Sequence, residues 1–195
     1  MTEADHILSD VYQRLGIEND TDEVKYTRIN DIVARLRARN RAQTINVKTT
    51  GTISERLCEL GLKTAVPDQY KIMRGEWKWI GDFLILGDPF NVIVSVKSFK
   101  AKERLMSSGS GHVLSPTIGW GLFNDKREWS PSRTRSYLLR GFIAIYLPKD
   151  LYRQLPKESK GITNLNGRKF VRRLDAFTSD LHLALLGNRV DIAKM

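Results

Sequence analysis

Two apolar, β-prone stretches separated by a short turn constrain the fold more than any other feature of the chain. Residues 76–86 are rich in Trp, Ile, Phe and Leu, and residues 91–99 are rich in Val and Ile. A Gly-Asp-Pro-Phe sequence at 87–90 lies between them, and these residue types favour a turn. The sequence therefore predicts a β-hairpin, against which the rest of the chain must pack.

Helices are expected on both sides of the hairpin. Thr52-Ile-Ser-Glu55 has the form of a capping box, and Gly16 and Gly61 are suited to end helices. Residues 141–147 are predicted to form a buried strand. The expected fold class is α/β, with a small mixed β-sheet that contains the hairpin and is flanked by helices. Helical spacing of apolar residues indicates five helices, at 5–15, 23–41, 52–61, 150–155 and 170–187.

The length of 195 residues suits a single domain, here residues 1–195 with an N-terminal helical part at about 1–48. Residues 107–136 hold many Ser, Gly, Pro and Arg, which predicts a long ordered loop that can include a short strand. No apolar run approaches the roughly 18 residues that span a bilayer, and no signal peptide is recognisable at the N-terminus. Cys58 is the single cysteine. A cytoplasmic protein without disulfides or a membrane partner is expected.

The excess of basic residues indicates a polyanionic partner. The chain has 32 Lys and Arg against 22 Asp and Glu, a formal net charge of +10. Four arginines lie in the far half of the helix predicted at 23–41, where they form either a solvated basic face or phosphate contacts. Trp120 and Trp129 could stack on bases, although core packing is commoner. The candidate DNA contacts are Arg35, Arg37, Arg39 and Arg41 on that helix and His112, Asn124, Lys126, Arg127, Arg133 and Arg135 in the long loop.

A carboxylate, a hydroxyl and an ammonium are expected on one face of the hairpin. If the two arms pair about a centre between Pro89 and Phe90, paired positions sum to 179 and Asp82 faces Lys97. Because every second side chain of a strand shares a face, Ser95 joins them, opposite Leu84. Asp82 and Lys97 form either a cross-strand ion pair or part of a catalytic centre, in which a carboxylate holds Mg²⁺ and a lysine stabilises developing charge or orients water.

Gly81-Asp82, twelve further residues and Ser95-Val96-Lys97 together resemble the PD-(D/E)XK nuclease motif. The resemblance implies a restriction-endonuclease-like fold and a Mg²⁺ site, with Asp82 as metal ligand, Lys97 as the motif lysine and Ser95 in the acidic position. Glu55 then corresponds to the helix glutamate that adds a metal ligand.

Two residues depart from that pattern: Gly81 replaces the usual proline, and Ser95 replaces the second acid. Glu55 and Glu103 are candidates for a relocated acid. A capping box explains Glu55 without metal, and a solvated helix face explains Glu103. His112 is either a DNA contact, a general base or a loop histidine without a special role.

The function that follows from this resemblance is Mg²⁺-dependent hydrolysis of double-stranded DNA by a type II restriction endonuclease. Cutting both strands favours a homodimer on a two-fold symmetric sequence, and a cognate methyltransferase is the expected companion. Two alternatives remain open: a monomeric repair or nicking nuclease, and a non-catalytic nucleic-acid-binding protein whose hairpin pair is structural.

Overall fold

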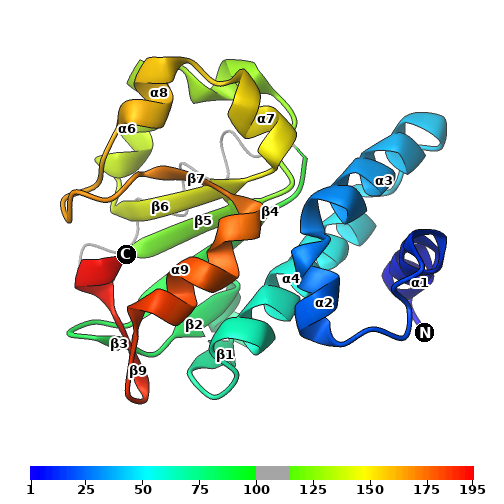
Figure 1. Cartoon of the computed structure of the whole chain (residues 1–195), viewed down its shortest axis with the longest axis horizontal. Helices are drawn as coiled ribbons and strands as arrows, with labels where there is room; N and C mark the ends of the chain where they lie inside the picture. Colours follow the sequence, from blue (N-terminus) through cyan, green and yellow to red (C-terminus); the bar gives the residue numbers. More distant parts are fainter. Residues whose placement is uncertain (100–114) are drawn as a thin grey trace.

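The computed structural model describes residues 1–99 and 115–195 and has a mixed α/β architecture (Figure 1). A six-stranded sheet has the order β1-β2-β4-β5-β6-β7, and a smaller one has the order β3-β9-β8. The coarse α/β fold class predicted from the sequence is confirmed. The strands are β1 Tyr70–Ile72, β2 Phe83–Ile85, β3 Gly87–Asp88, β4 Val92–Lys97, β5 Thr117–Gly121, β6 Phe142–Leu147, β7 Val171–Arg173, β8 Leu185–Leu186 and β9 Arg189–Asp191.

The described residues also contain α-helices and short 3-10 helices, which lie mainly around the larger sheet (Figure 1). None of these described helices is long and apolar enough to cross a membrane. The α-helices are α1 Glu3–Leu15, α2 Asp22–Thr27, α3 Ile29–Ala42, α4 Val47–Ala65, α6 Pro131–Leu138, α7 Lys149–Gln154, α8 Lys157–Gly161 and α9 Phe177–Ala184. The 3-10 helices are η1 Gly75–Trp79, η2 Lys126–Trp129, η3 Leu174–Ala176 and η4 Ile192–Lys194.

The two faces of the larger sheet have separate apolar cores. Successive residues of β6 point to opposite faces, and accordingly Ala144 and Tyr146 belong to one buried cluster while Ile145 and Leu147 belong to the other. The first cluster includes apolar residues from α1 to α4 and α9, and the second includes residues from α6 and α7. The sheet is therefore the middle layer, as expected for a half-parallel sheet covered by helices.

The direction of the strands divides the larger sheet into two parts. β1, β2 and β4 pair antiparallel, whereas β4, β5, β6 and β7 pair parallel. Lys97 pairs with Gly121 and Leu147 pairs with Arg173, so the carboxyl ends of the parallel strands share one edge. In open α/β sheets this is the edge where ligands bind.

The predicted N-terminal helix is confirmed, but the next two helices differ from expectation. The helix expected at 23–41 is two helices that meet at Arg28, whose ψ of 14° leaves the helical range. The break allows the buried Tyr26 hydroxyl to donate to the Leu174 carbonyl at 3.0 Å. Gly61 does not end α4, which continues to Ala65. A Cβ at this position would lie 2.6 Å from Tyr26 Cε2. That glycine instead permits the close packing of α2 against α4.

The predictions for 107–136 and 170–187 are only partly confirmed where those residues are described. Residues 115–136 contain a short strand, β5, as the sequence allowed, but also η2 and the start of α6, which were not expected. Trp120 and Trp129 are fully buried, so base stacking is excluded for both in this fold. The C-terminal helix spans only Phe177–Ala184, because Phe170 and Val171 are buried in the second core where the chain enters β7. The spacing of apolar residues alone does not distinguish a helix from a strand in short segments such as these.

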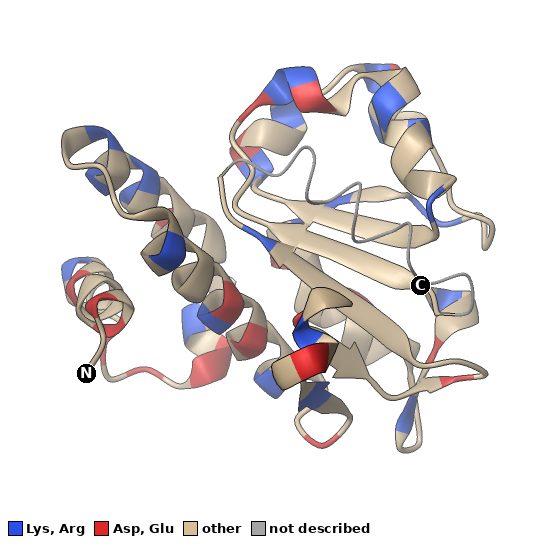
Figure 2. Ribbon diagram, turned by 180° about the vertical axis from the view of Figure 1, so that it is seen from behind, with Lys and Arg blue, Asp and Glu red and all other residues tan. Residues whose placement is uncertain are grey.

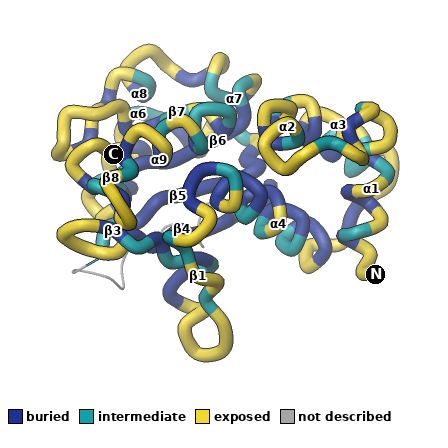
Figure 3. The backbone as a smooth tube through the Cα atoms, turned by 60° about the horizontal axis from the view of Figure 1, so that its bottom comes forward, coloured by how far each residue is buried: buried dark blue, intermediate teal, exposed yellow. Residues whose placement is uncertain are grey.

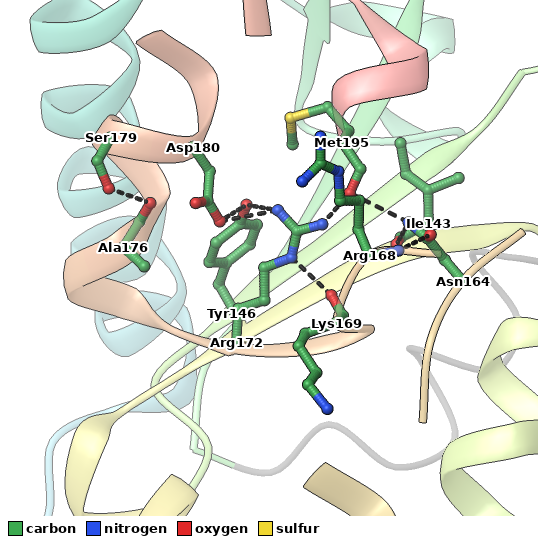
Figure 4. A network of polar contacts seen from close by, with 10 residues as sticks. All are labelled: Ile143, Tyr146, Asn164, Arg168, Lys169, Arg172, Ala176, Ser179, Asp180 and Met195. Carbon is green, nitrogen blue, oxygen red and sulfur yellow. Dashed lines mark hydrogen bonds and ion pairs between the residues drawn. The ribbon is translucent and has the colours of Figure 1, made fainter. Parts of the chain in front are cut away.

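A polar network joins β6, β7 and α9 (Figure 4). Arg172 Nη1 donates to Asp180 at 2.8 Å and to the Tyr146 hydroxyl at 3.2 Å, and that hydroxyl donates to Asp180 at 2.7 Å. Arg172 also donates to the carbonyls of Lys169 and Met195. Its side chain is only 10% exposed, so its charge depends on these partners.

We expect Asp180→Ala to lower the free energy of unfolding by about 3 kcal/mol or more, because it leaves the Arg172 charge without its carboxylate. Urea denaturation measures this loss. Asp31→Ala is the matched control, since it removes an exposed ion pair with Arg28 and should cost less than about 1 kcal/mol. Equal effects of the two substitutions would contradict a structural role for the buried network.

Candidate functional site

The register of the β2–β4 hairpin differs from the expected one by two residues. Phe83 pairs with Val94 and Ile85 with Val92, so paired positions sum to 177 and not to 179. Residues 86–91 connect the two strands, and within them Gly87–Asp88 leaves the hairpin to pair with β9. The pairing ends at Phe83 and Val94, and the Asp82 amide donates to the Val94 carbonyl, so Asp82 lies beyond the paired part of the hairpin and is not opposite Lys97. Within the paired part, a shift of two residues keeps every side chain on its expected face.

Asp82 is fixed to β4 through both its backbone and its side chain. Its amide donates to the Val94 carbonyl at 2.9 Å. Its Oδ2 accepts the Val96 amide proton at 2.7 Å, in the manner of a strand carbonyl. The carboxylate therefore has a set orientation at the start of β2.

Ser95 and Lys97 point from β4 to the face opposite Val94 and Val96. Lys97 Nζ donates to Ser95 Oγ at 2.7 Å. Ser95 is fully buried, whereas Lys97 is half-buried. Because Val94 and Val96 belong to the core on the opposite face, the alternation predicted for β4 is confirmed. Ser95 thus holds the ammonium of Lys97.

Glu55 lies in the middle of α4, and the capping box predicted for it is wrong. The helix begins at Val47, and the Asn46 side chain caps it by accepting the Lys48 amide at 2.7 Å. The alternative explanation for a carboxylate at position 55 is therefore removed. Glu55 Oε2 instead accepts from Lys78 Nζ of η1 at 2.9 Å. Lys78 lies 23 positions from Glu55 in the sequence. No local pattern relates the two residues, so this ion pair could not be predicted.

The pKa of Asp82 is raised above its ordinary value. Burial is the main cause, and the nearby negative charge of Glu55 adds to it. The hydrogen bond from Val96 and the positive charges of Lys97 and Lys78 act in the opposite direction without cancelling the rise. Two carboxylates thus share a partly desolvated region in which a further cation would be stabilised.

The donor set in this region fits a hard divalent cation. Asp82 and Glu55 each use one carboxylate oxygen in the hydrogen bonds above, and Mg²⁺ is commonly held by one or two protein carboxylates together with water and substrate phosphates. Within residues 1–99 and 115–195, no group of three or more His, Cys, Asp or Glu side chains converges. Glu103 and His112, the other candidates, lie outside the described residues.

The predicted DNA contacts of α3 have different surroundings. Arg35 and Arg41 are exposed, and Figure 2 shows the basic residues along this helix. Arg39 pairs with Asp10 at 2.5 Å. Arg37 is only 14% exposed and binds Asp150 and the carbonyls of Leu122 and Phe123. These contacts give Arg37 a structural role as a joint that links α3 to the carboxyl ends of β5 and β6. Its position therefore needs no bound phosphate to explain it.

The predicted contacts that follow β5 are all exposed. Arg127 forms a bidentate pair with Asp125, and Arg133 Nη1 donates to the Arg127 carbonyl at 2.9 Å. These hydrogen bonds hold the segment in a defined shape while the cations remain accessible. The exposed residues are Asn124, Lys126, Arg127, Arg133 and Arg135.

A hollow of about 640 Å³ lies apart from Asp82, along the outer strand β7. The side chains of Arg168, Lys169, Arg173 and Lys194 line it. None of these four cations is among the site residues predicted from the sequence. The hollow contains none of the residues of the candidate site.

Comparison with protein-family models, with curated proteins and with solved structures finds no significant match for this chain. Its function has to be inferred from the residues themselves.

We expect Asp82→Asn to leave the stability without metal unchanged or higher at pH 7. The raised pKa means that the folded state binds this proton more tightly than the unfolded state, so the stability contributed by Asp82 falls as pH rises through that pKa. An asparagine oxygen can still accept the Val96 proton but carries no charge. Mg²⁺ should raise the melting temperature of the wild type and not of the variant.

Thermal denaturation with and without Mg²⁺ measures both effects, with Asp88→Asn at an exposed position as the control. A loss of about 1 kcal/mol or more for Asp82→Asn without metal would indicate a stabilising cross-strand ion pair instead.

Proposed function

We propose that the chain is a Mg²⁺-dependent endonuclease that hydrolyses phosphodiester bonds of double-stranded DNA. The observation that carries the proposal is the convergence of Glu55 from α4, Asp82 from the start of β2 and Lys97 from the end of β4 at one edge of the sheet. Helix glutamate, strand aspartate and strand lysine are also the elements of the PD-(D/E)XK motif that the sequence resembles. A restriction-endonuclease-like architecture is part of this proposal.

Each residue then has a role that follows from its contacts. Asp82 and Glu55 would hold the cation, which when bound neutralises charge on the phosphate and activates water. Lys97 donates a hydrogen bond to the attacking water or to a phosphate oxygen. Ser95 positions the Lys97 ammonium through the 2.7 Å hydrogen bond and is not itself a ligand.

The cations near the same edge support a phosphate backbone as the substrate. Lys126 and Arg127 are exposed and follow β5, whose carboxyl end pairs with that of β4. Polyanionic DNA gains affinity from such positive charges through counterion release. The specific character of the proposal is a type II restriction enzyme that acts as a homodimer in the cytoplasm, with a methyltransferase as companion.

A non-catalytic nucleic-acid-binding protein is the second candidate. It is favoured by the contacts that already engage the polar groups: Glu55 pairs with Lys78, and Ser95 binds Lys97. On this alternative, the hydrogen bond from the Val96 amide to the Asp82 carboxylate has a purely structural role at the end of the β2–β4 pairing.

Asp82→Ala and Lys97→Ala are expected to lower the rate of DNA cleavage at least about 100-fold, because each removes stabilisation of the transition state. Supercoiled plasmid incubated with Mg²⁺ is the substrate, and DNA binding is measured separately without metal. Binding should persist in both variants. Lys157→Ala, which removes an exposed cation of α8 that has no part in the proposed site, is the control and should cleave within a few-fold of wild type. Wild-type turnover in either site variant would contradict this catalytic centre.

Lys78 should compete with the metal for Glu55. We therefore expect Lys78→Met to lower the Mg²⁺ concentration for half-maximal cleavage, and Glu55→Gln to raise it, by about tenfold or more. Because Glu55 is not a capping residue, Glu55→Gln should leave thermal stability nearly unchanged. Identical Mg²⁺ dependence of the wild type and Glu55→Gln would remove Glu55 from the metal site.

A further inference from the structure

A projecting segment beside the candidate site exposes two tryptophans. This segment, called here the tryptophan arm, comprises residues 70–79, with β1 and η1. Figure 3 shows the exposed loop after β1 extending beyond the rest of the chain. Trp77 is 65% exposed and Trp79 is 72% exposed, whereas Trp120 and Trp129 are fully buried.

Exposing two indole rings within three residues is unfavourable, because their apolar surface stays in contact with water. Tryptophan is highly buried on average, and clustered exposed apolar side chains usually mark an interaction surface. Ile72 of the same arm is also 44% exposed. The arm therefore has the composition of a contact surface, and its charge indicates the partner.

Cations flank the rings. Lys71, Arg74 and Lys78 lie in the arm, against the single acid Glu76. A second copy of this chain would bring like charges together at the contact. Nucleic acid satisfies both features at once, because its bases offer flat aromatic faces and its phosphates offer negative charge.

The arm is bonded to both candidate metal ligands. Lys78 Nζ donates to Glu55 Oε2 at 2.9 Å. The amide of Met73 donates to the carbonyl of Asp82 at 3.0 Å. A nucleotide held by the arm would thus lie next to the phosphodiester at the site.

We propose that Trp77 and Trp79 stack on unpaired nucleobases, so that the chain binds single-stranded or locally opened DNA through the arm. An intact duplex presents only base edges in its grooves, whereas the face of an indole requires an unstacked base. This inference relies on the proposed function in one respect only, namely that DNA is the polymer that is cut. Binding by the arm requires no cleavage.

Intrinsic fluorescence tests the arm directly, because its two indoles are the exposed ones. The full chain is titrated without Mg²⁺ with a single-stranded oligonucleotide, with its fully paired duplex and with a duplex that contains a short unpaired bubble. We expect saturable quenching by the single strand and by the bubble, and weaker quenching by the paired duplex.

Variants identify the residues responsible. Trp77→Ala with Trp79→Ala should lower the affinity for the single strand at least about tenfold, as stacking energies per base predict. The double phenylalanine variant should recover much of that affinity. Leu165→Ala removes a 99% exposed apolar side chain elsewhere and should bind as wild type. Circular dichroism verifies that each variant is folded.

Wild-type affinity of the double alanine variant for all three DNAs would overturn the inference. A change in oligomeric state with unchanged DNA affinity would also overturn it and assign the arm to contacts between copies. Cleavage in Mg²⁺ is scored separately. If the wild type stacks on DNA but does not cleave it, the proposed nuclease activity is contradicted and the proposed role of the arm stands. If the wild type cleaves DNA and the double alanine variant binds DNA with unaltered affinity, the role of the arm is contradicted and the nuclease activity stands.

Discussion

The hydrogen bond from the Val96 amide to the Asp82 carboxylate is the interaction on which the candidate site depends. It holds a partly buried charge at the end of a strand ladder, beside a second carboxylate that raises its pKa. Without it, Asp82 would lose the donor that does most to favour its ionised form. The arrangement is unfavourable for stability in isolation and is useful where a cation or phosphate arrives. Such local conflicts are expected at functional sites.

Much of the hairpin could be predicted from the sequence. Alternating apolar and polar residues placed Ser95 and Lys97 on the face opposite the core valines of β4, and this assignment survived a wrong register because the error was an even number of residues. The buried strand at β6 was also predictable from its continuous apolar run. These features depend on residues that are neighbours in sequence.

The features that could not be predicted depend on distant contacts. Phe170 has the spacing of a helix but enters β7, since its neighbours in space come from β6 and the second core. The pairing of Glu55 with Lys78 and the role of Arg37 as a joint likewise require segments that no local pattern relates. The exposure of Trp77 and the burial of Trp129 could not be told apart by residue type alone.

The pairing of β3 with β9 has a consequence for how the site forms. Gly87 pairs with Val190, and the Val190 amide donates to the Leu86 carbonyl at 2.9 Å, although these segments are about a hundred residues apart. Contacts of such sequence separation form slowly, because a long loop must close first. During synthesis the hairpin connection lacks this support until the last strand has emerged from the ribosome. A chain still being made would therefore hold Asp82, Ser95 and Lys97 in an unfinished arrangement until β9 has paired with β3.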